Sequence, residues 1–512
     1  MRSTIKIVIL LFFICTSMSG ASFPDMEKYM RQHALIWEQL PMQWNEGAFL
    51  GNGLVGMMVY ADSTLNALVF HLGRPDVTDH RKAPYRKTSI GTEEADKMVD
   101  FCRLDVGKML LFPEGKILSG TFYLDIYNAE LTGHLKTDKG DLTFHAYTPQ
   151  PEEVNIVEVS SGVPYRWKGI PGNPCSPRIR VFPHLKEKLK YKDNPAPVVN
   201  QKDKEGSWVQ SLLAGGDYAT YWKEVPGGKS RSVLYVSTAN EVPASSLSLA
   251  KAMKTVEATQ ITGTKLLKQK TRQWWNAYHE RSFLSIPDKK LENFYFIQMY
   301  KLATCSHPDG PAMDVMGTFF KLSPWPSFWW NLNIQLTYMP IGPANRMEQG
   351  KNFQRLMDEV FPSLVRSIEP CKIGDYTWAL QNYYMYLRYA GADWQDIKQQ
   401  VVPKALDAFA VFDKILCYKE NTWHLTHIES PEYEGFQKYN DSNYGLASLS
   451  WLLQTLIACH DRTSSTHPDY ARWKEILTRL APYPTNENGL MIAANKPLEK
   501  SHRHYSHLLA FY

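Results

Sequence analysis

The sequence is poor in cysteine, with seven in 512 residues, and none of them forms a CxxC pair or a cluster with histidine. Structural zinc sites and dense disulfide frameworks need such spacings. The three histidines in Ser501–Leu508 do not have the spacing of a helical HExxH pair. We therefore expect isolated core thiols, predict no metal site and no cofactor, and leave cysteine pairing open.

Long apolar runs are also missing, except at the start of the chain. Arg2 and Lys6 precede the apolar run Ile7–Cys15, and small residues follow up to Ala21. This order is typical of a secretory signal peptide over residues 1–21, although a retained anchor is the alternative. The run is short for a bilayer span. We expect a secreted or periplasmic protein without membrane insertion.

A strong charge of either sign is absent as well. The formal net charge is +5, and the basic residues are dispersed rather than gathered in a stripe. This distribution predicts no nucleic-acid partner. Aromatic residues are abundant at 13%, which suits an oligosaccharide or polysaccharide partner because apolar sugar faces stack on aromatic rings. The sequence does not indicate the oligomeric state.

The periodicity of the chain changes from strand-like to helical along its length. Many short strands separated by turn residues predict a β-sandwich domain over residues 22–243. Two lysine-rich helices follow in a predicted linker, 244–290, and a helical toroid or bundle is predicted over residues 291–512. No strand–helix alternation supports a parallel sheet.

The individual elements can be assigned approximate ranges. Strands are expected at Gly56–Tyr60, Asn66–His71, Thr121–Ile126, Asp141–Tyr147, Val154–Ser160, Arg178–Phe182, Ser207–Leu212 and Ser232–Ser237. A surface loop is expected at Lys186–Gly206. Helices are expected at Ala244–Thr259, Thr264–Arg281, Leu291–Cys305, Met347–Ile368, Tyr376–Tyr389, Ile397–Cys417, Tyr444–His460 and Tyr470–Leu480.

An aromatic stretch with two amides, Trp325–Pro340, is the first candidate for a binding site. It holds Asn331 and Asn333 among several rings, including Trp329. Aromatic walls with a few fixed amides suit a carbohydrate, whose hydroxyls need paired donors and acceptors. The alternative is a buried amphipathic segment whose amides cap a helix.

Glu432 is the candidate general acid. Pro431 disfavours a helix before it, which places Glu432 on a loop between helices. Partial burial there would raise the pKa of the carboxyl and hold a proton for a leaving group. A solvent-exposed acidic turn is the alternative for so short a motif, and Glu429 and Glu434 compete for the role.

Further candidates lie on either side of this loop. Trp378 stands near the start of a predicted helix, where it would reach a cleft, although aromatics at helical spacing are more often core residues. Arg503 and His504 lie in the histidine-rich segment near the chain end, and this pair suits donation to sugar hydroxyls.

Taken together, these motifs resemble glycoside hydrolase family 95, the α-L-fucosidase and α-L-galactosidase family, from about Trp37 to Tyr512. Their order along the chain carries the resemblance more than any single motif. The matching segments are Gly51–Val59 (the family's GNGRLGAMV), Tyr295–Gly310, Asn331–Gln335 (LNIN), Trp378–Tyr383, Ser430–Glu432 (SPEN) and His502–Leu508 (HRHLSHL).

The resemblance implies a fold and roles for the candidate residues. It implies an N-terminal β-sandwich, a helical linker and an (α/α)6 barrel with an inverting mechanism. Glu432 would then be the general acid, and Asn331 and Asn333 would be cleft amides that position the attacking water. Trp378, Arg503 and His504 would contact the sugar. An inverting site needs its catalytic groups roughly 6.5–9.5 Å apart to admit that water.

Several positions depart from the family pattern. Trp329 stands where the family has a histidine before the first asparagine, so it becomes a candidate substrate contact. The family's base aspartate follows its HRHLSHL motif, whereas the similar Asp441–Gly445 segment precedes it here. We therefore expect the catalytic domain to be truncated, and the 512-residue chain to hydrolyse aryl α-L-fucosides poorly.

The sequence thus supports a glycosidase that removes terminal α-L-fucosyl or α-L-galactosyl units. The alternative is a non-catalytic saccharide-binding relative, or an inactive fragment, that lacks the base. Another inverting (α/α)6 enzyme, such as an α-L-rhamnosidase, is less favoured. The linkage and the parent glycan are not predicted.

Overall fold

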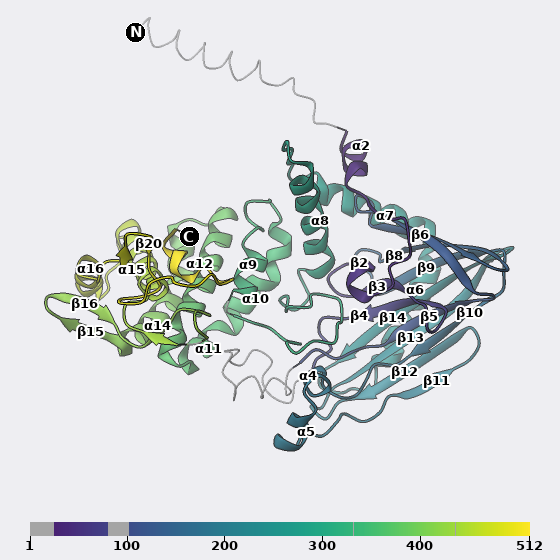
Figure 1. The fold of residues 1–512 in the computed structure, drawn as a ribbon, viewed down its shortest axis with the longest axis horizontal. Helices are drawn as coiled ribbons and strands as arrows, with labels where there is room; N and C mark the ends of the chain where they lie inside the picture. Colours follow the sequence, from purple (N-terminus) through teal and green to yellow (C-terminus); the bar gives the residue numbers. More distant parts are fainter. Residues whose placement is uncertain (1–24, 80–101, 331, 436, 512) are drawn as a thin grey trace, which may run out of the picture.

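The computed structural model describes residues 25–79, 102–330, 332–435 and 437–511. The signal-peptide prediction for residues 1–21 and the candidate Asn331 lie outside these ranges. A large region of β-sheet is followed by a helical region, and the two lie side by side (Figure 1). This order confirms the predicted change from strands to helices.

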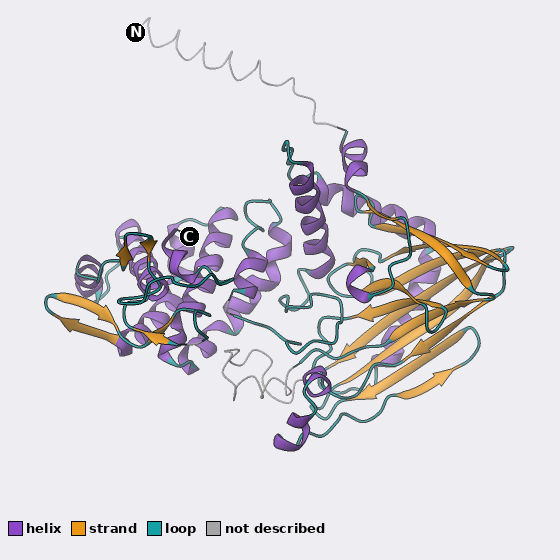
Figure 2. Cartoon of the chain, in the orientation of Figure 1, coloured by secondary structure: helices purple, strands orange, loops and turns teal. Residues whose placement is uncertain are grey.

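Two antiparallel sheets form the first region (Figure 2). The nine-stranded sheet has the order β1 (Leu35–Trp37), β6 (Ile117–Asp125), β7 (Glu130–Thr137), β8 (Gly140–Tyr147), β9 (Val154–Ser161), β14 (Arg231–Glu241), β13 (Asp217–Gly228), β12 (Glu205–Ser211) and β11 (Val198–Gln201). The five-stranded sheet has the order β10 (Tyr165–Ile170), β5 (Lys108–Pro113), β4 (Ala67–Gly73), β3 (Gly56–Asp62) and β2 (Ala48–Gly51).

Aromatic side chains from both sheets meet in one hydrophobic core. The Phe70 ring of β4 lies 5.5 Å from the Phe144 ring of β8 and 5.3 Å from the Trp167 ring of β10, measured between centroids. Edge-to-face contacts of this kind add to the stabilisation that comes from burying the rings. Period-two burial along β6, where Phe122 and Leu124 are buried and Tyr123 between them is exposed, explains why the strand expected at Thr121–Ile126 was readable from the sequence.

The two lysine-rich helices of the predicted linker pack against the nine-stranded sheet. They are α6 (Ser248–Thr262) and α7 (Thr264–His279), joined at Gly263, whose φ is +79°. Ala252 and Val256 of α6 are buried in a cluster with Tyr235 of β14. The boundaries at 243 and 290 stay predictions, but these helices share apolar surface with the sheet.

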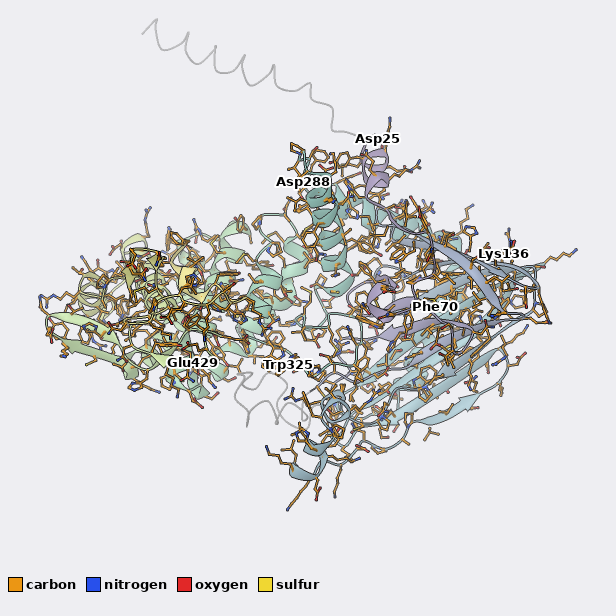
Figure 3. All side chains as sticks on the ribbon, viewed as in Figure 1. Asp25, Phe70, Lys136, Asp288, Trp325 and Glu429 are labelled. Carbon is orange, nitrogen blue, oxygen red and sulfur yellow. The ribbon has the colours of Figure 1, made fainter. Side chains whose placement is uncertain are left out.

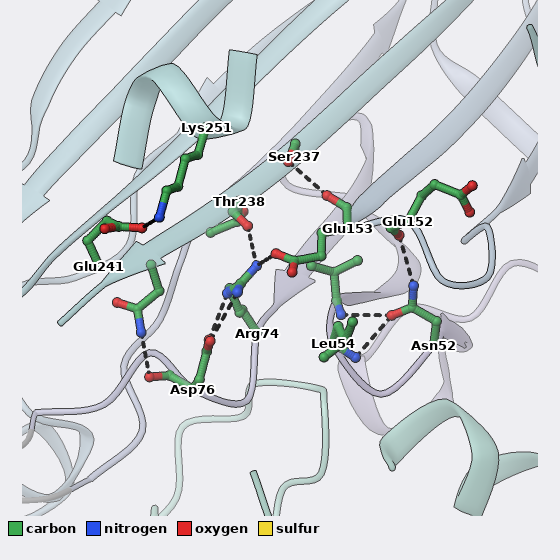
Figure 4. A network of polar contacts seen from close by, with 12 residues as sticks. Asn52, Leu54, Arg74, Asp76, Glu152, Glu153, Ser237, Thr238, Glu241 and Lys251 are labelled. Carbon is green, nitrogen blue, oxygen red and sulfur yellow. Dashed lines mark hydrogen bonds and ion pairs between the residues drawn. The ribbon is translucent and has the colours of Figure 1, made fainter. Parts of the chain in front are cut away.

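A cluster of charged residues around Arg74 holds neighbouring loops of the sheet region together (Figure 4). The Arg74 guanidinium donates to both carboxylate oxygens of Asp76, at 2.7 and 3.0 Å, and to the Thr238 carbonyl at 2.5 Å. It also pairs with Glu153. Arg74 is buried, so these partners compensate its loss of hydration and fix three segments that are distant in sequence.

Helix α8 (Lys289–Cys305) joins the two regions. Its Phe296 and Tyr300 are buried in the core of the sheets, whereas Met299 and Leu302 are buried in the core of the helical region. The helix begins where the Asp288 carboxylate accepts the backbone N–H groups of residues 290 and 291. One helix therefore contributes to both cores.

The helical region contains several further helices and short antiparallel hairpins. The helices are α9 (Asn333–Tyr338), α10 (Lys351–Glu359), α11 (Phe361–Ser367), α12 (Ile373–Tyr389), α13 (Trp394–Gln400), α14 (Val402–Phe412), α15 (Asn443–Thr463) and α16 (Tyr470–Thr478), with a final 3₁₀ turn, η7 (Ser506–Phe511). The hairpins pair β15 (Leu416–Lys419) with β16 (Thr422–Leu425), β17 (Ile428–Glu429) with β18 (Lys438–Tyr439), and β19 (Thr485–Asn486) with β20 (Gly489–Leu490). The closed (α/α)6 barrel stays a prediction.

Some expected elements are wrong. The expected strand Arg178–Phe182 is helix α4 (Pro177–Val181), because Pro177 at its first position has the φ that a helix start requires. The expected loop at Lys186–Gly206 contains most of the short helix α5 (His184–Lys188) and strand β11. The expected helix Ile397–Cys417 divides into α13 and α14 and ends in strand β15.

No disulfide joins the cysteines of the described ranges. Cys417 is exposed on β15, so the expectation of a core thiol is wrong at this position. Among the described helices, none combines the length and the apolar character needed to cross a membrane.

Candidate active site

Glu432 lies on the loop that connects β17 to β18, as the sequence predicts. The chain near the C-terminus holds this loop from one side. The Ser430 and Ser506 hydroxyls are 2.8 Å apart, and the buried Tyr433 hydroxyl accepts the Glu499 backbone N–H at 2.9 Å. Two segments more than sixty residues apart therefore fix the position of Glu432.

The carboxylate of Glu432 meets the two basic residues that were predicted to bind the sugar. Arg503 donates to its Oε2 from Nη2 at 2.5 Å and from Nε at 3.1 Å, and His504 Nε2 lies 3.3 Å from the same oxygen. The Glu432 side chain is 17% exposed and that of Arg503 is 77% exposed. Burial lowers the pKa of His504, which favours a neutral imidazole. The carboxylate is thus covered by a guanidinium that faces solvent.

Trp378 belongs to the same neighbourhood, on the second turn of α12. Its ring centroid is 6.2 Å from that of Tyr505 and 6.5 Å from that of Tyr444. Trp378, Pro431 and His504 line one small cavity. The structure therefore brings Trp378, Glu432, Arg503 and His504 into one neighbourhood although they are far apart in sequence. The Trp378 ring is itself buried there, at 4% exposed.

The aromatic stretch contributes less to this group than expected. Asn333 is the exposed first residue of α9, and its side chain has no hydrogen-bond partner in the part of the chain that the structure describes. Its neighbour Leu332 lines the same small cavity as Pro431. Trp329 is buried, and its ring lies 5.1 Å from that of Trp325. The predicted contact of Trp329 with substrate is therefore not supported, because its ring is used in packing.

Trp325 lies near the junction of the two regions, apart from Glu429 (Figure 3). The Arg178 guanidinium of α4 lies 4.8 Å from the Trp325 ring centroid. This cation–π contact joins the start of the aromatic stretch to helix α4 of the sheet region.

The two competing glutamates differ sharply from Glu432. Glu434 is exposed and pairs with Lys496 at 3.0 Å. Glu429 is buried, and burial together with the nearby Asp375 carboxyl raises its pKa to about 8. Glu429 would thus hold a proton at neutral pH, but it is only 4% exposed and offers little access to a substrate.

Sequence reasoning missed the buried partner of this glutamate, Asp375. Burial raises the pKa of Asp375 to about 6, and the Tyr444 hydroxyl donates to its Oδ1 at 2.7 Å. Asp375 comes one helical turn before Trp378, and Tyr444 packs edge-on to the Trp378 ring. The sequence feature that could have identified Asp375 is its position one helical turn before the aromatic candidate Trp378.

Asp441, in the segment that imitates the family's base motif, is engaged elsewhere. Its Oδ2 lies 2.7 Å from His424 Nδ1, and its Oδ1 accepts the Leu425 backbone N–H at 2.8 Å. The residue is 7% exposed. Its contacts tie β16 to the start of α15, which is a structural role.

The histidines of the final segment do not form a metal site. His502 and His507 have ring centroids 6.0 Å apart, and burial lowers the pKa of both side chains. Within the described ranges, no group of three or more histidine, cysteine or carboxylate side chains is arranged to hold a metal ion.

Comparison with solved structures finds matches to several carbohydrate-active proteins. A human-microbiome protein described as a kojibiose phosphorylase has a TM-score of 0.55 and 10% sequence identity; the match covers 86% of this chain and 66% of that protein. A bacterial glucoamylase in complex with acarbose has a TM-score of 0.48 and 9% identity, and the match covers 87% of this chain and 69% of that protein. A family GH92 α-mannosidase from Bacteroides thetaiotaomicron has a TM-score of 0.33 and 8% identity, with 85% of this chain and 62% of that protein covered.

Of these three matches, one establishes a shared fold. Only the first TM-score exceeds 0.5, and at 10% identity it establishes a shared fold alone. The chain spans slightly less than two thirds of the length of that protein. The sequence matches no protein-family model and no curated protein.

Proposed function

We propose that the protein is an exported glycoside hydrolase of the family-95 type that inverts the anomeric centre of terminal α-L-fucosyl or α-L-galactosyl units. The observation that carries this proposal is the convergence of Glu432, Arg503 and His504 beside the Trp378 ring. A carboxyl group, a solvent-exposed guanidinium and an aromatic ring are the parts that sugar binding and leaving-group protonation require. The fold shared with a protein described as a kojibiose phosphorylase supports the same chemical class.

Glu432 is assigned the role of general acid. While Arg503 pairs with Oε2 of Glu432, it occupies the oxygen that a leaving group would have to approach. Arg503 is largely exposed, and a sugar hydroxyl can draw it away from the carboxylate. Release of Arg503 would open the Glu432 carboxyl to the leaving oxygen, to which it would donate a proton as the general acid.

The attacking water is assigned to Asn331 and Asn333. Amides orient water, but they have negligible basicity near neutral pH, so a carboxylate must accept the water's proton. Asp441 is poorly suited to this role because both of its oxygens have internal partners. The proposal therefore requires a base other than Asp441, placed beside the asparagines.

The decisive experiment replaces Glu432 with glutamine and uses Glu434→Gln as the matched control. Turnover is measured on an aryl α-L-fucoside and on an α-L-fucosyl oligosaccharide, with the galactosyl counterparts in parallel. In a protein that carries the required base, Glu432→Gln should lower turnover of the oligosaccharide by about 10²–10⁴-fold, the usual contribution of a positioned acid. The aryl substrate should lose less because its leaving group needs less protonation.

The controls separate the alternatives. Glu434→Gln should retain activity, because Glu434 is exposed and contacts Lys496 rather than Arg503. Equal losses on both substrates would argue against Glu432 as the acid. Sugar binding without turnover would support the non-catalytic saccharide-binding alternative, and release of a sugar phosphate only when phosphate is added would indicate phosphorolysis. Absence of both binding and turnover would refute the proposal.

A further inference from the structure

Helices α12 and α15 leave a second hollow next to Trp378, with a volume of about 120 Å³. Trp378 and Leu509 line both this hollow and the small cavity at Pro431 and His504. The hollow therefore adjoins the candidate active site across the Trp378 ring. Other side chains that line the hollow come from α12, from α15 and from the chain between α16 and β19. They include Gln381, Ser450, Trp451, Gln454 and Tyr483.

The chemistry of these side chains suits a sugar ring. Trp451 and Tyr483 are half-buried and supply aromatic surface, and the Trp451 ring is supported edge-on by Tyr384, with centroids 6.0 Å apart. The Gln454 amide and the Tyr483 hydroxyl make no hydrogen bond to any described residue. A pyranose offers one apolar face and several hydroxyls, so it can satisfy both kinds of surface at once.

Another hollow along α12 provides a comparison. It has a volume of about 180 Å³ and shares Trp378 and Gln381 with the first. Its remaining lining is mostly apolar and includes Met339, Ile341 and Met385. Its Asn382 amide already donates to the Gln335 carbonyl, and the Tyr386 hydroxyl donates to the Met347 carbonyl. The hollow between α12 and α15 instead presents the Gln454 amide and the Tyr483 hydroxyl, which bond to no described residue.

From this contrast we infer that the hollow between α12 and α15 is a second saccharide subsite, which binds the pyranose unit adjacent to the terminal sugar. The inference rests on the proposed function, because the terminal unit is assigned to the Glu432 site. It makes the substrate an oligosaccharide or a polysaccharide end rather than a simple glycoside. Trp451 would stack against the sugar, and Gln454 would bind its hydroxyls.

Calorimetric titration of the full chain tests this inference without requiring turnover. The probes are methyl α-L-fucoside and an α-L-fucosyl-capped trisaccharide, with the galactosyl pair in parallel. The trisaccharide should bind at least about tenfold more tightly than the methyl glycoside, as expected for one additional aromatic contact. Gln454→Ala and Trp451→Ala should each remove most of this difference and change methyl glycoside binding by less than about twofold.

A matched control is Gln399→Ala, because Gln399 is exposed on α13 and lies outside the lining of the hollow. It should bind both probes as the unmodified chain does. Gln454 is also exposed, so its replacement should leave the fold intact even if Trp451→Ala destabilises it. If the methyl glycoside binds but the trisaccharide binds no more tightly, the subsite is refuted while the proposed function stands. If neither sugar binds, both proposals fail.

Discussion

Three glutamates within six residues have three different environments. Glu429 is buried near Asp375, Glu432 is covered by Arg503 and His504, and Glu434 reaches Lys496 at the surface. Their spacing in the sequence does not predict these environments, because the residues that surround each carboxyl are distant along the chain. The chemical roles of this loop are therefore set by tertiary contacts.

Glu429 gives a prediction about the pH dependence of stability. Burial raises its pKa from the ordinary 4.5 to about 8, so the folded protein binds a proton that the unfolded chain releases above pH 4.5. The free energy of unfolding should therefore fall as pH rises from about 5 to 8. Asp375, with a pKa raised from 3.8 to about 6, contributes with the same sign at lower pH.

Glu429→Gln imitates the protonated side chain and should remove much of this fall. Denaturant unfolding at pH 5 and pH 9 should show the variant gaining about 1–3 kcal/mol relative to the unmodified protein at the higher pH. The same measurement on Glu434→Gln should show no such gain, since Glu434 is exposed. An unchanged pH slope in Glu429→Gln would contradict the assignment of a buried, protonated carboxyl.

At the scale of elements, α12 and α15 approach closely behind the candidate site. A Cβ atom on Gly374 would lie 2.3 Å from Cε1 of Tyr444. Only glycine allows the Tyr444 ring to pass there and donate its hydroxyl to Asp375. This crossing sets the position of Trp378 relative to the loop that carries Glu432.

Gly374→Ala should therefore destabilise the protein, although alanine is the better helix former by about 1 kcal/mol. The overlap with the ring should outweigh that gain and leave a net loss of about 1–3 kcal/mol in the free energy of unfolding, measured with urea. Gly227→Ala is the control, because its nearest contact would be 3.6 Å and should cost little. A stabilised Gly374→Ala variant would show that the Tyr444 ring moves aside freely.

At the scale of the whole molecule, α8 connects the two cores. Phe296 is 1% exposed in the core of the sheets, and Met299 is 4% exposed in the core of the helical region. The Tyr278 hydroxyl of α7 also donates to the Met299 carbonyl at 2.7 Å. If one region unfolded, α8 would lose its packing on that side. The other region would then be destabilised, because its own core includes residues of α8.

This connection predicts one calorimetric unfolding transition rather than two. Phe296→Ala should lower the free energy of unfolding by about 3–5 kcal/mol, and it should shift that whole transition to lower temperature. Phe294→Ala, on the same helix but 60% exposed, should have little effect. Two transitions, of which Phe296→Ala moves only one, would show that the regions unfold independently.

The sequence by itself determined the change from strands to helices and the position of Glu432 on a loop. Both follow from local physics, because alternating burial gives period two in strands and proline disfavours the helix before Glu432. The boundaries were less accurate where a local signal was overruled, as at Pro177, which starts a helix in a segment with a strand-like pattern.

Only the tertiary structure decided which candidates meet. Arg503 and His504 reach Glu432 because the chain near the C-terminus folds back over the loop, whereas Trp329 is used in packing against Trp325. The raised pKa of Glu429 likewise depends on burial and on Asp375, more than fifty residues earlier. A sequence pattern records which residues are near in the chain, but desolvation and charge act through space, so these features required the fold.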